Sequence, residues 1–184
     1  MKKYFASFIN HLFKYKYYIL VLFFIALIIF YFLNRPHQPS YRNQITPGQT
    51  TPEQLSQRLG QPTNKGQWKS FEVLDYPSNS KWNDKIFLQN NEIALVTEII
   101  PRETTQKSTN YINKYGNPPL TMYGLLSPTF NLYAYPSLGF AMVANPDQKI
   151  LYQLWYFPPT TNNDFINNLA TPNEYTLDIP DENH

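Results

Sequence analysis

A helix-ending pattern that occurs three times along the chain is the feature that most constrains its fold. In the first copy, Thr51 and Gln54 form a capping box around Pro52, and a short apolar helix then stops at a Gly that a Pro follows. The pattern recurs 56 residues later, from Gly60 to Gly116, and a looser third copy comes 54 residues after that. The aligned positions are Leu55, Leu59, Gly60 and Pro62; Tyr111, Tyr115, Gly116 and Pro118; and Phe165, Leu169, Ala170 and Pro172. Such a period predicts a repeated supersecondary unit.

Segments between the helix signals have the alternation and the turns of antiparallel strands. An aromatic strand at 68–76 parallels another at 130–135, and Pro and Ser follow each of them. A hairpin at 85–100, with its turn at 89–92, parallels a second hairpin at 140–157. The sequence therefore predicts an α+β fold of two tandem small modules, each a short helix packed on an antiparallel sheet of about three strands, plus a C-terminal helix.

The N-terminal segment predicts a membrane anchor. Residues 17–33 carry no charge, and a helix of that length spans about 25 Å, just short of a bilayer core of roughly 30 Å. Flanking lysines that snorkel and tyrosines that suit the interface make up the difference. No small-x-small site follows the run, which disfavours the alternative of a cleaved signal peptide. The lipid bilayer is thus an expected partner through residues 17–33.

The distribution of charge predicts an orientation and excludes one class of ligand. Four lysines precede the uncharged run, and the first 33 residues contain no acidic residue. This asymmetry predicts a single-pass protein of the cell membrane with a cytoplasmic N-terminus and an extracytoplasmic C-terminal domain. From Asn34 onward the chain carries the other 11 of its 15 basic residues and all 13 acidic ones. A nucleic-acid reader would carry an excess of Lys and Arg in its folded part, so we expect no nucleic-acid partner.

Residues 45–62 resemble the opening of a known family. They contain Gly48 and Thr50, followed by Leu59-Gly60-Gln61-Pro62, and are similar to the Gly-x-Thr and Leu-Gly-x-Pro motifs of BamE/SmpA-OmlA-like domains. The hairpin turn at 87–93 fits the same family pattern, although the chain has no Cys for lipid attachment. Two such modules in tandem are similar in architecture to β-lactamase inhibitor proteins, and the resemblance implies that an uncovered sheet face holds a protein partner. The module signature is carried by Gly48, Leu59, Gly60, Pro62, Gly116 and Pro118.

Together these signals divide the chain into six parts. They are a basic cytoplasmic segment at 1–16, a transmembrane helix at 17–33, an extended tether at 34–46, a first BamE-like module at 47–104, a second at 105–160, and a closing helix and tail at 161–184. The tether is assigned because its polar, proline-containing sequence has too few apolar residues to pack.

Catalytic constellations are missing from the sequence. His11, His37 and His184 lie in terminal or linker positions, so the folded body has no imidazole for a catalytic triad or a metal site. There is also no Cys, P-loop, nucleophile elbow or dinucleotide-binding glycine pattern. Glu72 and Asp75 are paired carboxylates, but they alternate with apolar strand residues, which is typical of a solvated strand face. We therefore predict no enzymatic activity, no metal and no cofactor.

Aromatic strand residues supply the positive signal for function. The strand at 151–157 is apolar on both sides, and Gln153 marks the side on which Trp155 would face outward. By the repeat, we expect one outward sheet surface that bears Tyr76, Tyr133, Tyr135, Gln153 and Trp155. Rigid amphipathic side chains of this kind are enriched at interaction hot spots. The alternative is that these aromatics are buried against helices or between the two modules.

The predicted function is a membrane-anchored, non-catalytic scaffold or adaptor that docks an envelope protein on its sheet face. The alternative is a glycan-binding or inhibitory module on the same scaffold, because Tyr and Trp stack on sugar rings and neighbouring amides bind hydroxyls. A protein partner would need roughly 800 Å² of surface on each side, whereas a sugar would need only one or two aromatics in a groove.

Overall fold

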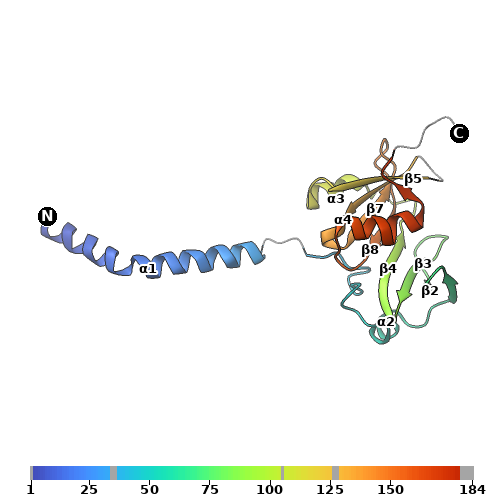
Figure 1. The fold of residues 1–184 in the computed structure, drawn as a ribbon, viewed down its shortest axis with the longest axis horizontal. Coiled ribbons are helices and arrows are strands. Elements are labelled where there is room, and N and C mark those ends of the chain that lie inside the picture. The colour runs from blue at the N-terminus through green and yellow to red at the C-terminus, as the bar shows by residue number, and fades with distance from the viewer. Residues whose placement is uncertain (1, 34–36, 105, 126–128, 179–184) are drawn as a thin grey trace. The chain divides into compact units, whose positions relative to one another are not determined.

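A computed structural model describes residues 2–33, 37–104, 106–125 and 129–178 of the chain (Figure 1). The chain divides into two compact units, of which the first ends at Pro36 and the second begins at His37. The first unit consists of one helix, α1 (Lys2–Leu33). The second unit contains the sheet and the remaining helices, and it holds the candidate site described below.

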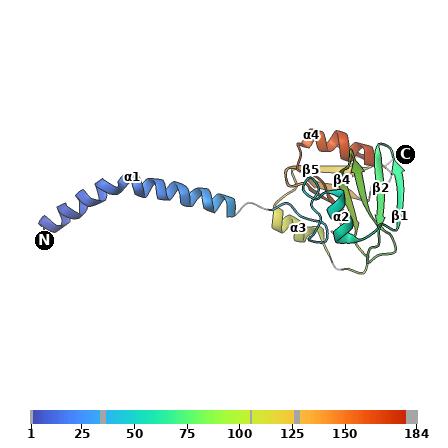
Figure 2. The same ribbon diagram turned by 90° about the horizontal axis from the view of Figure 1, so that it is seen from below.

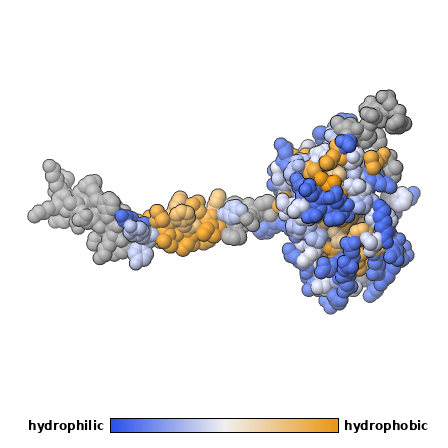
Figure 3. All heavy atoms as spheres, viewed as in Figure 1, coloured by the Kyte–Doolittle hydropathy of each residue, from blue (hydrophilic) through white to orange (hydrophobic). Residues whose placement is uncertain are grey.

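Helix α1 corrects the prediction of a membrane anchor. Its described side chains after Lys16 are apolar and exposed (Figure 3). Nevertheless, no helix in the described residues combines the length and the apolar character needed to cross a bilayer. The transmembrane helix predicted at 17–33 is therefore wrong, and so is the predicted single-pass localisation with a cytoplasmic N-terminus and an extracytoplasmic domain.

In the described part of the second unit, nine antiparallel strands form one continuous sheet (Figures 1 and 2). The strands are β1 (Asn64–Trp68), β2 (Phe71–Tyr76), β3 (Asp84–Gln89), β4 (Glu92–Ile99), β5 (Leu120–Gly124), β6 (Asn131–Tyr135), β7 (Phe140–Ala144), β8 (Leu151–Tyr156) and β9 (Tyr175–Thr176). Their order across the sheet is β1-β2-β3-β4-β8-β7-β6-β5-β9. The helical elements are α2 (Pro52–Leu59), α3 (Ser108–Tyr115), α4 (Asn162–Phe165), η1 (Pro136–Leu138), η2 (Ile166–Ala170) and η3 (Thr171–Asn173).

This sheet corrects the predicted fold class and family. Each half of the repeat contributes four strands rather than about three, and β4 pairs with β8, so the halves share one sheet. A continuous sheet of nine antiparallel strands is not a tandem of BamE-like modules, and the resemblance to BamE/SmpA-OmlA-like domains and to β-lactamase inhibitor proteins is wrong. Gly60 and Gly116 nevertheless end their helices at positive φ, of 78° and 82°, as the repeated stop signal predicts.

The two halves correspond strand by strand. Tyr76 pairs with Asp84 at one end of β2–β3, and Tyr135 pairs with Phe140 at the same point of β6–β7. Both hairpins that follow carry a β-bulge, after Phe87 in β3 and after Val143 in β7. The registers therefore match β1–β4 with β5–β8 residue for residue around these anchors. The halves join where Thr97 of β4 pairs with Trp155 of β8. Thr97 occupies the same position in the first half that Trp155 occupies in the second half.

The two faces of the sheet are covered differently. One face of the sheet, called the helix face below, packs beneath α2 and α3, which contribute Leu55 and Tyr111 to its core cluster. The opposite face is called the groove face, after the groove described in the next subsection. The groove face carries a second core cluster that includes Phe165 of α4 and Ala170 of η2. Figure 1 shows α4 lying over β7 and β8, on the second half of the sheet. The groove face of the first half has no such helix in the described residues, and this difference positions the candidate site.

Residues 37–46 are packed and do not form the extended tether that the sequence predicts. Tyr41 and Ile45 are fully buried and form an isolated β-bridge that closes a tight turn. The turn is possible because Arg42 and Asn43 both adopt positive φ. Gln38 also donates a hydrogen bond to the carbonyl oxygen of Phe157, at 3.0 Å. Two apolar side chains in a polar segment are therefore enough to fix it when the sheet offers a complementary core.

Candidate functional site

An open groove of about 550 Å³ lies on the groove face of the first half. Its floor is formed by β2, β3, β4 and β8, and strand β1 lines one side. The segment 172–175, which runs from η3 into β9, lines the groove as well. Its lining residues are Asn64, Gly66, Gln67, Trp68, Val73, Asp75, Lys85, Phe87, Thr97, Gln153, Trp155, Pro172, Asn173, Glu174 and Tyr175. The groove thus brings together residues from nearly the whole length of the second unit.

The centre of the floor is polar. Lys85 and Asp75 face each other on β3 and β2, with 3.5 Å between the Lys85 Nζ and Asp75 Oδ1 atoms. Asn64 donates from Nδ2 to the other oxygen of Asp75, at 3.3 Å. The Lys85 side chain is half exposed, whereas that of Asp75 is mostly covered, so the ammonium group is the one that a ligand would meet. Thr97 adds a hydroxyl on the neighbouring strand.

Aromatic side chains flank this polar centre near the β1–β2 turn. Trp68 stacks on Phe71 with 6.0 Å between ring centroids, and it meets the edge of Phe87 at 5.8 Å. The Lys69 ammonium group lies over the Trp68 ring, 4.3 Å from its centroid. Because its neighbours already contact the indole in this way, Trp68 is held in place but offers little free ring surface.

The segment 172–175 is tied to the sheet by side-chain contacts as well as by the pairing of Tyr175 with Gly124 of β5. Lys69 donates from Nζ to the carbonyl oxygen of Pro172, at 2.6 Å, and so connects the β1–β2 turn to this segment. Tyr175 packs edge-on against Trp155 with 5.6 Å between ring centroids. Burial raises the pKa of Tyr175 to about 12. The groove is therefore bounded by fixed elements.

The equivalent surface of the second half has a different composition. Where the first half has Gly66, Asp75 and Lys85, the matched positions of the second half are Met122, Ala134 and Ala141. These three are fully buried in the core cluster that includes the closing helix. The first half thus has Gly or a charged residue at positions where the second half has apolar residues that pack in the same core cluster as its own helix.

The structure does not bring the five sequence-predicted site residues together. Gln153 and Trp155 line the groove, with the Trp155 Nε1–H donating to Gln153 Oε1 at 2.9 Å, although Trp155 is almost fully buried. Tyr76, Tyr133 and Tyr135 belong to or pack against the core cluster of the opposite face. There is therefore no single surface on which all five are displayed, because the aromatics divide between the two faces of the sheet.

Two of these tyrosines have a structural role at the helix ends. The Tyr135 hydroxyl donates to the carbonyl oxygen of Gly116 at 2.7 Å, and Tyr76 makes the matching, longer contact to Gly60 at 3.5 Å. Burial raises the pKa of Tyr135 to about 12. The sequence repeat therefore includes a matching contact in each half, in which a strand tyrosine donates to the carbonyl oxygen of the glycine that ends the helix.

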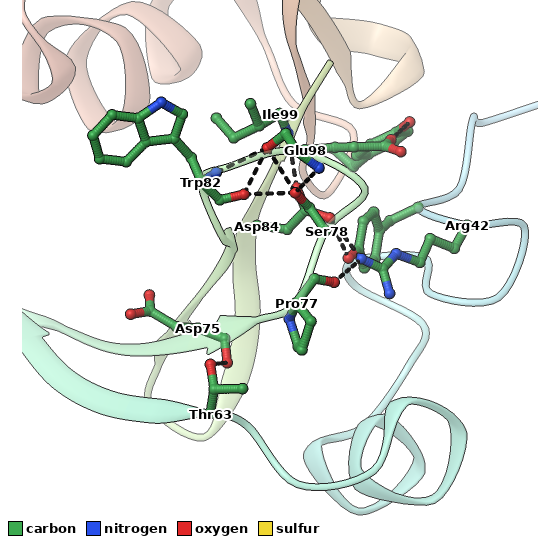
Figure 4. Close-up of polar contacts among 12 residues, drawn as sticks. Arg42, Thr63, Asp75, Pro77, Ser78, Trp82, Asp84, Glu98 and Ile99 are labelled. Carbon is green, nitrogen blue, oxygen red and sulfur yellow. Dashed lines mark hydrogen bonds and ion pairs between the residues drawn. The ribbon is translucent and has the colours of Figure 1, made fainter. Parts of the chain in front are cut away.

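A second polar cluster lies on the helix face, between the turn at Tyr41 and strands β3 and β4 (Figure 4). The buried Asp84 carboxylate accepts hydrogen bonds from the Tyr41 hydroxyl at 2.7 Å and from the main-chain N–H of Ile99 at 2.8 Å. Arg42 forms an ion pair with it, at 2.8 Å, and also donates to the carbonyl oxygen of Pro77. Every Asp84 oxygen is thus engaged, so the cluster fixes the chain and leaves no free group for chemistry.

Glu98 lies beside this cluster and accepts a hydrogen bond from the Tyr156 hydroxyl, at 2.6 Å. Burial raises the pKa of Glu98 above its ordinary value, an effect that the hydrogen bond from Tyr156 partly opposes. Burial and the Glu98 charge together raise the pKa of Tyr156. In the described residues there is no group of three His, Cys, Asp or Glu side chains that could hold a metal ion.

The sequence did not predict that Trp68, Asp75 and Lys85 lie together in one groove. The signal available was the break in correspondence between the halves, where polar residues on β2 and β3 replace alanines on β6 and β7. That signal is visible only once the register is known, because insertions of different length separate the strands of the two halves.

Comparisons with known proteins show resemblance only at the level of distant structure. No family model matches the chain, and no curated protein matches it. Three solved structures, each 10% identical in sequence, are similar. One is an extracellular SCP-domain protein from Bacillus anthracis, with a TM-score of 0.45, covering 72% of this chain and 49% of that one.

The other two similar structures also come from bacteria. A DUF4309 family protein from Bacillus subtilis has a TM-score of 0.45 and covers 67% of this chain and 86% of that one. A cysteine-rich secretory protein from Staphylococcus aureus has a TM-score of 0.47 and covers 78% of this chain and 51% of that one. The chain spans about half the length of the first and third of these proteins.

Proposed function

We propose that the chain is a non-catalytic binding module that holds a segment of a protein partner in the groove of its first half. The observation that carries this proposal is the contrast between the halves. The chain covers the groove face of the second half with its own helix, and it leaves the matched surface of the first half open, with a polar floor. This open, polar surface is therefore available to a ligand.

The chemistry of the groove suits a protein segment. An interaction surface typically combines apolar contacts with polar groups that fix register. The part of Trp68 that lines the groove supplies an apolar contact, and Lys85 and the surrounding amides supply the polar groups. A sugar ring would need a free aromatic face. Trp155 is buried, and Trp68 is contacted by Phe71, Phe87 and Lys69, so the groove offers little of that surface. These contacts favour a protein ligand over the glycan alternative.

The proposal is tested by site-specific crosslinking of the full chain in its native cells. A photo-crosslinking amino acid is placed at Lys85 in the groove and, as a matched control, at the exposed Lys114 of α3 on the other face of the sheet. We expect a discrete protein adduct from position 85 that is absent from position 114, and that Trp68→Ala reduces at least fivefold. Equal labelling from both positions would contradict the proposal. Retention of the chain on purified cell-wall glycan, without any adduct, would favour the glycan alternative.

A further inference from the structure

Strand β1 is an unprotected edge of the sheet. It is the first strand in the sheet order and, among the described residues, pairs with β2 alone, in continuous register from Asn64 to Trp68. Residues 64–67 are all exposed. Natural proteins protect such an edge with Pro, a bulge or charged residues, Lys above all; β1 has neither Pro nor a bulge, and Lys65 is its single charged residue. The free edge lies directly beside the groove.

The chain itself shows what binds to the corresponding edge of the second half. Strand β5 matches β1, and its outer side is covered by β9, an extended segment that pairs antiparallel with Tyr123 and Gly124. The main-chain N–H of Leu125 donates outward to the carbonyl oxygen of Glu174 at 2.8 Å, whereas that of Gly124 points inward to Phe130. By the shared register, Tyr123 matches Gln67, so the main-chain groups of Gln67 face the open side of β1.

Gly66 adds a place for a side chain. The residue at the equivalent position of the second half is the buried Met122. A Cβ added at Gly66 would meet no atom within 4 Å. Glycine in a strand leaves space that a large residue of a neighbouring strand fills. On β9, the residue after Thr176 is Leu177, and continuation of the pairing would place a residue of that type opposite the position of Gly66.

We propose that an extended segment of the partner adds to the free edge of β1 as an antiparallel strand, with a large apolar side chain seated over Gly66 and directed towards the groove. This inference rests on the proposed function and specifies the form of the ligand. Main-chain hydrogen bonds to β1 would supply affinity, and the open space over Gly66 would accommodate the side chain.

The probe for this inference is a labelled peptide that copies residues 171–178, the segment that contains β9. We expect saturable binding to the full chain by fluorescence anisotropy, together with slower hydrogen exchange of β1. Gln67→Pro removes the outward N–H and should weaken binding at least tenfold, whereas Gln67→Ala keeps that N–H and should weaken binding much less than the Pro variant does. Gly66→Met fills the space over the glycine and should also weaken binding. Unfolding midpoints of all three variants establish that they are folded.

Three outcomes would overturn the inference. They are absence of saturable binding to the wild-type chain, equal binding by the Pro and Ala variants, and binding that leaves exchange in β1 unchanged. The adduct formed from position 85 separates this inference from the proposed function. If Gln67→Pro leaves that adduct intact, the groove still holds a protein partner, and only its addition to β1 is refuted.

Discussion

Asp84 is the residue that ties the start of the second unit to the sheet. It is almost fully buried and accepts from Tyr41, Arg42 and the main chain of Ile99. A carboxylate in this position contributes by satisfying several donors at once, so its removal leaves more than one buried group without a partner.

Replacing Asp84 with Ala should lower the free energy of unfolding by about 2–4 kcal/mol. The Arg42 side chain is 36% exposed, so solvent screens part of the ion pair, and the loss should fall below that of a fully buried pair. Urea denaturation followed by tryptophan fluorescence measures the change. Asp75→Ala is the control, because its ion pair to Lys85 is longer and more exposed, and it should cost less than about 1 kcal/mol. Equal losses for the two variants would contradict the role of Asp84.

Glu98 should make stability depend on pH in the opposite sense to an ordinary salt-bridged carboxylate. Burial raises its pKa in the folded state, so the folded chain binds this proton more tightly than the unfolded chain does. The contribution is fully present below the ordinary value of 4.5 and is lost as the pH rises through the raised folded pKa. Glu98→Gln preserves the acceptor for Tyr156 and removes the titration. The stability difference between wild type and Glu98→Gln, measured from pH 4 to 8, should therefore shift in favour of the variant as the pH rises. A difference that stays constant with pH would refute this.

At the scale of elements, helices α2 and α3 occupy matched positions but begin differently. Thr51 and Gln54 form a complete capping box at the start of α2. Helix α3 has Lys107 at its N-cap, with no side-chain hydrogen bond there and no acidic residue in its first turn. A basic residue at this end is also unfavourable to the helix dipole.

This difference predicts substitutions of opposite sign. Thr51→Ala should destabilise the chain by about 1 kcal/mol, because the N–H of Gln54 loses its acceptor. Lys107→Thr should stabilise it by up to about 1 kcal/mol by supplying the cap that α3 lacks. Thermal unfolding monitored by circular dichroism measures both changes. The main-chain bridge between residues 107 and 150 is kept in this variant, so a loss of stability in Lys107→Thr would contradict the expected capping.

At the scale of the whole molecule, the chain separates before His37, and the residues after that point include a buried turn. A fragment comprising residues 37–184 should therefore unfold in one cooperative transition. A fragment that begins at residue 47 lacks Tyr41 and Ile45, and it should be at least 3 kcal/mol less stable, because two large buried side chains and the donors to Asp84 are lost together. Calorimetry of both fragments measures this. Equal stability would mean that residues 37–46 contribute nothing to the core.

Local features of the second unit could be predicted from the sequence because short-range chemistry decides them. The capping box at Thr51, the stops at Gly60 and Gly116, and the tight turn at Asn90 and Asn91 all follow from residues within a few positions of one another. The turn residues both have positive φ, which Asn tolerates in a two-residue hairpin.

The candidate site could not be predicted in the same way, because it depends on which face of each strand is covered. Strand β8 is apolar on both faces, so alternation could not show that Tyr133 and Trp155 lie on opposite sides of the sheet. The burial of Tyr41 was also hidden, since its partner Asp84 is 43 residues away along the chain. Long-range pairing decides both features, and no local pattern encodes it.

The self-matching pair at Thr97 and Trp155 has a consequence for the origin of the fold. Val96 pairs with Tyr156, and Leu154 pairs with Glu98, so exchanging the two halves reproduces the same pairing. A rotation axis through that pair therefore relates the halves, which is the arrangement that joining the two subunits of a symmetric homodimer would produce. In such a fusion, the segment between β4 and α3 would be the covalent joint between the two subunits. Divergence after such a fusion would have left one subunit to be closed by the C-terminal helix and the other to stay open for a ligand.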